Sequence, residues 1–172
     1  MRQLHPDPVL RSPIDAGLVP TELITAYIDG GARGNPGPAG YGVYIELPDG
    51  SVEELHGGLG IATNNIAEYN GLLAALRWAV DHDHGVVRIK ADSELLVKQM
   101  RGEYKVRNAG LLPLVARARV LVGQLERVTF EHVRREQNKD ADRLSNVGMD
   151  EAEEALRNPP RPEEPPGQGE LF

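Results

Sequence analysis

The spacing of apolar residues changes along this chain, and this change limits the folds it can adopt. Three short apolar runs separated by glycine- and proline-rich turns come first, and their composition predicts β-strands. From residue 64 onward apolar residues recur at intervals of three and four, which predicts helices, and two more short apolar runs lie between them. This order predicts a single α/β domain.

The expected elements follow the turn signals. The first three strands are connected by an expected loop at 30–40 and a turn at 48–50 and should form an antiparallel meander, whereas the later two are reached through helices and should add in parallel. Strands are expected at 23–28, 41–47, 51–59, 86–91 and 127–133, and helices at 64–82, 93–100, 111–125 and 138–156.

Two extensions flank the expected domain at 23–157. Residues 1–22 carry four prolines without periodicity, so we expect a loosely held N-terminal extension. Residues 158–172 are rich in proline and glutamate, cannot bury apolar surface, and should be disordered.

Composition excludes several kinds of function. Because the chain has no cysteine, it has no disulfide, thiolate nucleophile or cysteine-based zinc site. No apolar run reaches the roughly 18 residues of a membrane span, and the N-terminus lacks the apolar segment of a signal peptide. We therefore expect a cytoplasmic protein with no membrane partner.

The net charge of −7 at first argues against a nucleic-acid partner. However, seven acids and two bases lie from Asp150 onward, and the preceding 149 residues have a balance of only −2. If four of the remaining acids bind metal ions, the rest of the body carries about +2, which predicts a modest electrostatic affinity for nucleic acid.

Four carboxylates stand at the ends of expected elements. Asp29 ends the first strand and Asp92 the fourth, while Glu68 lies in the first turn of helix 64–82 and Asp142 near the start of the last helix. If the first and fourth strands are neighbours, these groups meet at one sheet edge, where mutual repulsion raises their pKa values and divalent cations relieve it. Two Mg²⁺ or Mn²⁺ ions roughly 3.5–4 Å apart can activate a water and stabilise the leaving oxygen of a phosphodiester.

Each carboxylate also has an ordinary structural interpretation. Asp29 could be a turn residue, Glu68 could form a capping box with Asn65, and Asp92 could cap the helix that follows it. Asp142 could be a solvated helical acid with basic neighbours. The spacing alone leaves both interpretations open.

Four motifs resemble those of the type 1 ribonuclease H family. They are YIDGGARGNPGPAGYG at 27–42, TNNIAEY at 63–69, ADS at 91–93 with LLV at 95–97, and REQNKDADRL at 135–144. They occur in the family's order, over about residues 23–150.

This resemblance implies a five-stranded mixed sheet of order 3-2-1-4-5 flanked by helices. It also implies a nuclease that cuts the RNA strand of RNA–DNA hybrids with two Mg²⁺ ions, for which Mn²⁺ can substitute, leaving 5′-phosphate and 3′-hydroxyl ends. The implied catalytic and metal-binding residues are Asp29, Glu68, Asp92 and Asp142.

The resemblance further implies substrate contacts. Asn35, Asn64 and Asn65 would touch the minor groove of the hybrid, where a 2′-hydroxyl donates and accepts hydrogen bonds as an amide does. Thr63 and Asn108 resemble a pocket for a phosphate of the DNA strand, although Thr63 or Asn64 could simply cap the helix and Asn108 could sit in a turn.

The chain departs from many members of this family in two segments. Residues 133–138 run straight to the last helix without a mobile histidine loop, and we expect His132 to be structural. Residues 102–113 are short and carry only Lys105 and Arg107 in place of a basic, tryptophan-rich handle, which predicts a weaker grip on the substrate or help from a partner. Glu94 replaces a glutamine that touches substrate in some relatives, so that contact is not expected here.

The last five residues resemble a bacterial sliding-clamp-binding peptide of pattern Gln-x-x-Leu-Phe. Gln168, Leu171 and Phe172 occupy the pattern's positions, and a proline-rich leash would let them reach an apolar cleft on a clamp. We expect a monomer that acts in DNA replication.

Three other functions remain open. A nuclease of the same fold could prefer double-stranded RNA, and a non-catalytic module could bind hybrids or a clamp. The four carboxylates argue against the module, because a pure binder gains nothing from negative charge near phosphates. A metal store would not need the asparagines and glycines of segment 30–40.

Overall fold

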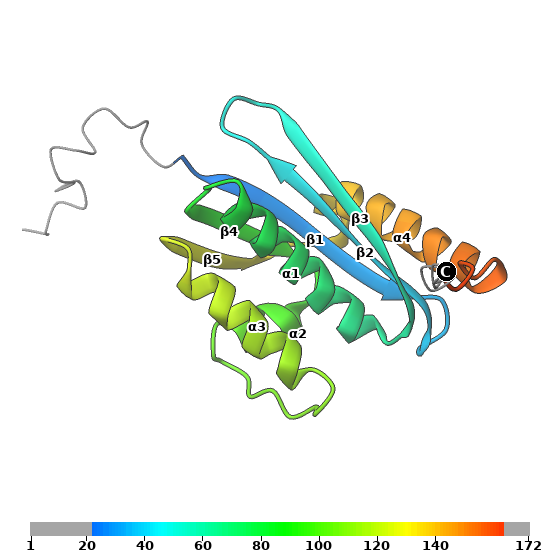
Figure 1. Cartoon of the computed structure of the whole chain (residues 1–172). Coiled ribbons are helices and arrows are strands. Elements are labelled where there is room, and N and C mark those ends of the chain that lie inside the picture. Colours follow the sequence, from blue (N-terminus) through cyan, green and yellow to red (C-terminus); the bar gives the residue numbers. More distant parts are fainter. Residues whose placement is uncertain (1–21, 164–172) are drawn as a thin grey trace, which may run out of the picture.

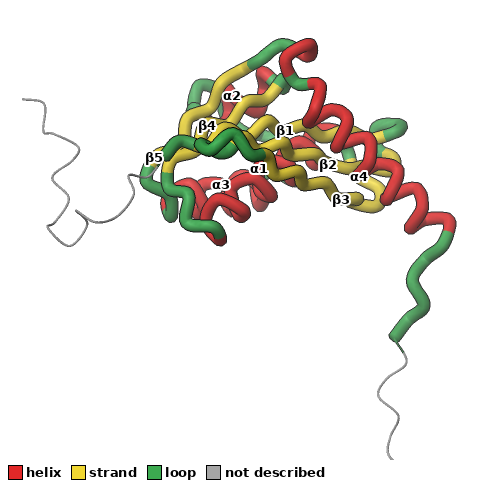
Figure 2. The backbone as a smooth tube through the Cα atoms, turned by 90° about the horizontal axis from the view of Figure 1, so that it is seen from above, coloured by secondary structure: helices red, strands yellow, loops and turns green. Residues whose placement is uncertain are grey.

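The computed structural model describes residues 22–163, which form one mixed sheet with helices on both faces (Figures 1 and 2). The strands are β1 (Ile24–Ala32), β2 (Gly37–Glu46), β3 (Val52–Ala62), β4 (Val86–Ala91) and β5 (Arg127–His132). The helices are α1 (Asn64–Asp81), α2 (Glu94–Met100), α3 (Leu112–Gly123) and α4 (Lys139–Arg157), with a 3-10 turn, η2, at Arg135–Gln137. Residues 1–21 of the predicted extension at 1–22, and the clamp-binding peptide with Gln168, Leu171 and Phe172, lie outside the described residues.

The sheet has the order β3-β2-β1-β4-β5, which confirms the predicted α/β fold and strand order. β1 pairs antiparallel with β2 and parallel with β4, and β5 adds in parallel to β4. In the β1–β4 ladder Ile28 pairs with Ala91, so the next residues, Asp29 and Asp92, emerge side by side at its carboxyl end.

The first strand is longer than the sequence predicts. β1 does not end at Asp29, which pairs with Gly42 of β2, but continues to Ala32, so the expected loop 30–40 shrinks to residues 33–36. The prediction was wrong because glycine-rich segments usually mark turns. Here the glycines stay in the strand, where they let other backbone come close.

Helices α1 and α3 cover one face of the sheet and α4 covers the other, as Figure 1 shows. Alternate residues of β1, Ile24, Ala26 and Ile28, are buried in a core that includes Leu72 and Leu76 of α1. None of the helices among residues 22–163 is long and apolar enough to cross a membrane.

Two strand glycines bring these helices close to the sheet. A Cβ atom on Gly30 would overlap the α1 backbone at Ala67 and Glu68, and one on Gly42 would overlap the α4 backbone at Ala141. Because glycine has no side chain, the helix starts can lie directly against β1 and β2.

Gly42→Ala should therefore destabilise the fold, because the added methyl group meets backbone that cannot move aside. We expect a loss of about 3 kcal/mol in the free energy of unfolding, measured by urea denaturation. Gly123→Ala is the matched control, since a Cβ there meets nothing within 4 Å. It should change stability by about 1 kcal/mol or less, towards stabilisation. Equal stabilities for the two variants would contradict this account of the packing.

Candidate active site

Four acidic side chains from separate parts of the fold line one pocket of about 330 Å³. Asp29 comes from β1, Asp92 follows β4, and Glu68 and Asp142 lie near the starts of α1 and α4. Asp142 is exposed, whereas the other three are half-buried. The pocket therefore lies at the sheet edge where the sequence placed these carboxylates.

Two polar residues fix α4 beside Asp29. The Ser145 hydroxyl lies 3.0 Å from Asp29 Oδ2 and 2.8 Å from the Asp142 carbonyl oxygen, and its single proton can go to either. The buried Asn138 Nδ2 donates to the Ile28 carbonyl at 2.9 Å. These contacts hold the first turn of α4 against the strand that carries Asp29.

Helix capping leaves Glu68 and Asp92 available to the pocket. Thr63 is the N-cap of α1 and its Oγ1 accepts from the Ile66 N–H at 3.3 Å, so the alternative of a capping box between Asn65 and Glu68 is wrong. Glu68 consequently lies in the second turn, not the first.

The second capping alternative also fails. Ser93, not Asp92, caps α2, because its Oγ accepts from the Leu96 N–H at 3.2 Å. Asp142 is exposed on α4, as its structural interpretation predicts. Its neighbour Arg143, however, pairs with Glu54 and Asp140 instead.

Burial, and to a lesser extent the charge of Asp92, raises the proton affinity of two of the carboxylates. Burial, and then the charge of Asp92, raises the pKa of Asp29 from its ordinary 3.8 to about 7. Burial also raises the pKa of Glu68 to about 7, despite a hydrogen bond with Ser93 that acts in the opposite direction. Such a pocket is suited to a positively charged ligand.

The donor set fits hydrated Mg²⁺ or Mn²⁺. All four groups offer hard oxygen atoms. Among the described residues the pocket is lined by no histidine or cysteine, the ligands that Zn²⁺ sites usually require. Within residues 22–163 no three acidic or histidine side chains converge into a ready coordination cluster. A Mg²⁺ ion does not need such a cluster, because it keeps several water ligands and substrate phosphates complete its coordination shell.

The predicted minor-groove residues meet at the start of α1. Asn35 Oδ1 accepts from the Asn64 N–H at 3.1 Å, and Asn64 Oδ1 accepts from the Ala32 N–H at 2.8 Å. These bonds tie segment 33–36 to the helix and leave both side-chain NH₂ groups as donors. Asn65 is the next helical residue and is exposed.

Thr63 and Asn108 have the local roles that were the alternatives to phosphate binding. Thr63 caps α1, and Asn108 Oδ1 accepts from the Gly110 N–H at 2.8 Å in an exposed turn. The Thr63 hydroxyl proton and the Asn108 NH₂ group can still donate. Their part in a phosphate pocket stays a prediction.

The sequence did not single out Arg135, the one basic side chain of the described residues that lines the pocket. Arg135 lies in η2, a 3-10 turn within segment 133–138 that the sequence did not predict. Its position in the fourth motif was the available signal. His132, expected to be structural, is exposed and its Nε2 lies 3.2 Å from the Asp92 carbonyl oxygen.

Known proteins share this sequence pattern. A family model described as reverse transcriptase-like matches residues 27–148. The bifunctional protein Rv2228c of Mycobacterium tuberculosis is 46% identical over 126 residues, which cover 72% of this chain and 35% of that protein. The chain thus spans about a third of the length of the first curated relatives it matches.

Solved structures share the fold as well. The ribonuclease H1 of Halobacterium salinarum is 38% identical with a TM-score of 0.72, over 76% of this chain and 100% of that one. LC11-RNase H1, isolated from compost and solved in complex with an RNA/DNA hybrid, is 41% identical with a TM-score of 0.69. That match covers 75% of this chain and 98% of the other.

The raised pKa of Asp29 predicts how stability depends on pH when a chelator removes divalent ions. A carboxyl group whose pKa is raised on folding contributes stability below its ordinary pKa and loses it as pH rises through about 7. At pH 8 the free energy of unfolding of Asp29→Asn should therefore be about 1–2 kcal/mol higher than that of wild type. At pH 4 the variant should have no such advantage.

Urea denaturation at the two pH values measures this difference. Asp81→Asn, at an exposed aspartate at the far end of α1, is the control and should show no such gain. A wild type as stable as Asp29→Asn at pH 8 would show that burial and the charge of Asp92 do not penalise the ionised Asp29 carboxylate.

Proposed function

Because the chain belongs to the type 1 ribonuclease H family, we propose that it hydrolyses the RNA strand of RNA–DNA hybrids. The observation that supports this most is the pocket that Asp29, Glu68, Asp92 and Asp142 line together. The hybrid complex of LC11-RNase H1, 41% identical to this chain, supports the same substrate. The products would carry 5′-phosphate and 3′-hydroxyl ends.

The four carboxylates are proposed to hold two Mg²⁺ ions, or Mn²⁺ in their place. When bound, the ions would activate the attacking water and stabilise the leaving 3′ oxygen. Half-buried Asp29 and Glu68 must lose their protons first, because only the ionised carboxylates are good metal ligands. Ser145 keeps the Asp29 carboxylate oriented through its hydrogen bond.

Other side chains would position the hybrid. The NH₂ groups of Asn35 and Asn64 can donate to 2′-hydroxyl oxygens, which explains a preference for RNA on the cut strand. Asn65 is proposed to contact the same groove, and Thr63 and Asn108 a phosphate of the DNA strand. Arg135 can offset the negative charge of a phosphate that enters the acidic pocket.

We propose in addition that Gln168, Leu171 and Phe172 bind a bacterial sliding clamp, which would couple cleavage to DNA replication. This proposal rests on the sequence pattern and on the proline-rich leash before it. We expect the protein to act as a monomer in the cytoplasm.

Asp92→Asn should abolish cutting while leaving the fold intact, because it removes a central metal-binding charge without changing the shape of the side chain. The measurement is cleavage of a labelled RNA strand paired with DNA, paired with RNA, or alone, with Mg²⁺, Mn²⁺ or chelator. We expect wild type to cut only the hybrid and only with metal. Asp140→Asn, at an exposed acid of α4 outside the pocket, is the control and should cut normally.

Other outcomes identify the competing functions. Equal cutting of the RNA duplex would indicate a nuclease for double-stranded RNA, and hybrid binding without cutting would indicate a binding module. Normal cutting by Asp92→Asn would show that the site assignment is wrong.

Replacing Leu171 and Phe172 with alanine should remove clamp binding, since these residues supply the apolar anchors. Binding of a purified bacterial clamp to the full chain can be followed by surface plasmon resonance. Glu170→Ala, at a variable position of the pattern, should bind like wild type. Unchanged clamp binding by the double variant would refute this role of the tail.

A further inference from the structure

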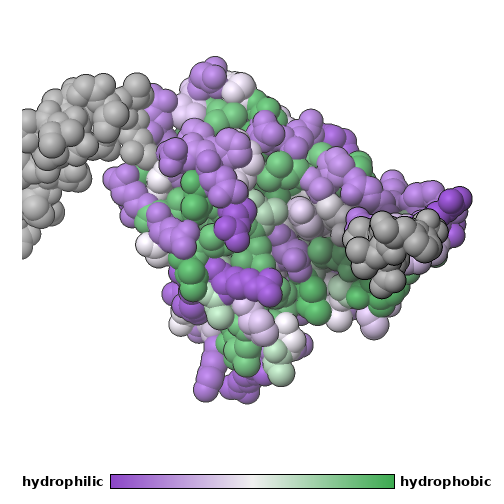
Figure 3. Space-filling model, in the orientation of Figure 1, coloured by the Kyte–Doolittle hydropathy of each residue, from purple (hydrophilic) through white to green (hydrophobic). Residues whose placement is uncertain are grey.

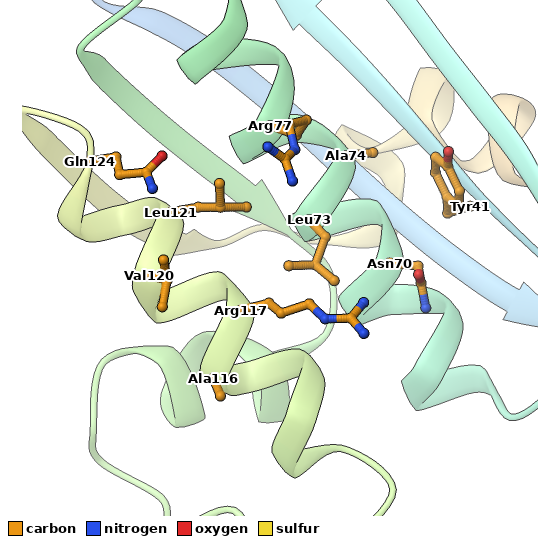
Figure 4. Close-up of a pocket in the computed structure, with 10 residues that line it drawn as sticks. All are labelled: Tyr41, Asn70, Leu73, Ala74, Arg77, Ala116, Arg117, Val120, Leu121 and Gln124. Atoms are coloured by element: carbon orange, nitrogen blue, oxygen red, sulfur yellow. The ribbon is translucent and has the colours of Figure 1, made fainter.

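A groove of about 560 Å³ lies between α1 and α3, on the face of the sheet opposite α4 (Figure 4). Leu73, Ala74 and Leu121 make part of its lining apolar. Val120, which also lines the groove, is 62% exposed, the largest exposed fraction among the large hydrophobic residues of the described part. Figure 3 shows this face with apolar surface interspersed among hydrophilic groups. A volume of this size is typical of ligand sites.

Two arginine side chains line this groove from opposite sides, next to its apolar residues. Arg77 extends from α1 and Arg117 from α3, and Figure 4 shows both reaching over the space between the helices. Both are exposed, and neither forms an ion pair with another residue of segment 22–163. An acidic group bound between them would be attracted by both. The groove thus suits a ligand that combines apolar anchors with a carboxylate.

We propose that the groove binds residues 168–172 of the same chain. Leu171 and Phe172 would pack on the apolar lining, and the carboxylate of Glu170 would lie between the two arginines. This segment unites the features that the groove matches, two large apolar side chains directly after an acid. The inference depends on neither hybrid cleavage nor clamp binding.

A nucleic-acid strand fits the groove less well. Proteins that bind single strands offer stacked aromatic side chains along a basic channel. Here Tyr41 is the one aromatic residue that lines the groove within the described part, and the floor is aliphatic. Two cations over an apolar floor favour an acidic peptide with apolar anchors.

The chain is long enough to reach the groove. Helix α4 ends at Arg157, and residues 158–163 are exposed and without regular secondary structure. The 14 residues from 158 to Leu171 span up to about 45 Å when extended. A domain of this size has a radius of gyration of about 14 Å. The C-terminal part of α4 packs at Ala152 against Gly58 of β3, the edge strand of the sheet, so the segment passes round that edge to the groove and need not cover half the perimeter.

The tether makes even a weak contact effective. A short flexible linker gives an effective concentration in the millimolar range, so a free peptide with a Kd on the order of 1 mM would fill about half of the grooves when tethered. Docking would also cover Leu171 and Phe172. Any other partner that binds these side chains would first have to displace them from the groove.

Paramagnetic NMR on the full chain tests this directly. Because the sequence has no cysteine, Gly169→Cys provides a single attachment point for a nitroxide label. In dilute labelled protein, without clamp or nucleic acid, the amide signals of Leu73 and of residues 116–124 should lose most of their intensity. Reduction of the nitroxide should restore them.

Charge reversal in the groove provides the matched pair of variants. Arg117→Glu should restore the signals of the groove residues, whereas Arg119→Glu, on the same helix but outside the groove, should leave them broadened. Weak, uniform broadening in the unaltered sequence, or equal broadening in both variants, would overturn the proposal. Binding of a free acidic peptide without broadening by the tethered label would assign the groove to another protein, and would also overturn it.

Discussion

Helices α1 and α4 lie against opposite faces of the sheet where β1 and β2 carry Gly30 and Gly42, and the rest of the site depends on this close packing. A side chain at either glycine would push a helix away from the strands. Since Glu68 is part of the α1 contact, and Asp142 directly follows the α4 contact at Ala141, a shift of either helix would move a carboxylate away from Asp29. The parallel β1–β4 pairing adds Asp92 beside Asp29 without help from a helix.

This packing creates an electrostatic conflict that the fold alone does not resolve. Asp29 and Glu68 are held in half-buried positions near Asp92, and burial raises both pKa values to about 7. Hydrophobic contacts on the α1 face hold the sheet and its helices together. These contacts therefore hold the negatively charged groups together in the folded protein, whereas the same groups would move apart in the unfolded chain. Buried and neighbouring negative charges favour cation binding, and this explains why a nuclease would keep acids together beside a polyanionic substrate.

Much of this architecture could be predicted from the sequence, because the change from strand-like to helix-like periodicity marks each element. The four motifs predicted the strand order and which carboxylates to examine. The extent of β1 could not be predicted, because a glycine that permits close packing looks the same in sequence as one that permits a turn. Likewise, Thr63 and Ser93 competed with their neighbours as helix caps, and only the backbone geometry distinguishes them. Arg135 was missed because its place in the pocket depends on how η2 turns before α4.

The carboxyl end of the β1–β4 ladder is proposed here as a metal-dependent site for RNA cleavage. A crystal structure of the Asp142→Asn variant with an RNA–DNA hybrid and Mg²⁺ tests it most directly, because slowed chemistry should preserve the intact substrate. We expect electron density for Mg²⁺ about 2.1 Å from oxygens of Asp29 and of an RNA phosphate, with Asn35 and Asn64 against 2′-hydroxyl groups. A hybrid bound elsewhere on the protein, or an RNA phosphate in the pocket without a metal ion beside Asp29 and Asp92, would contradict it.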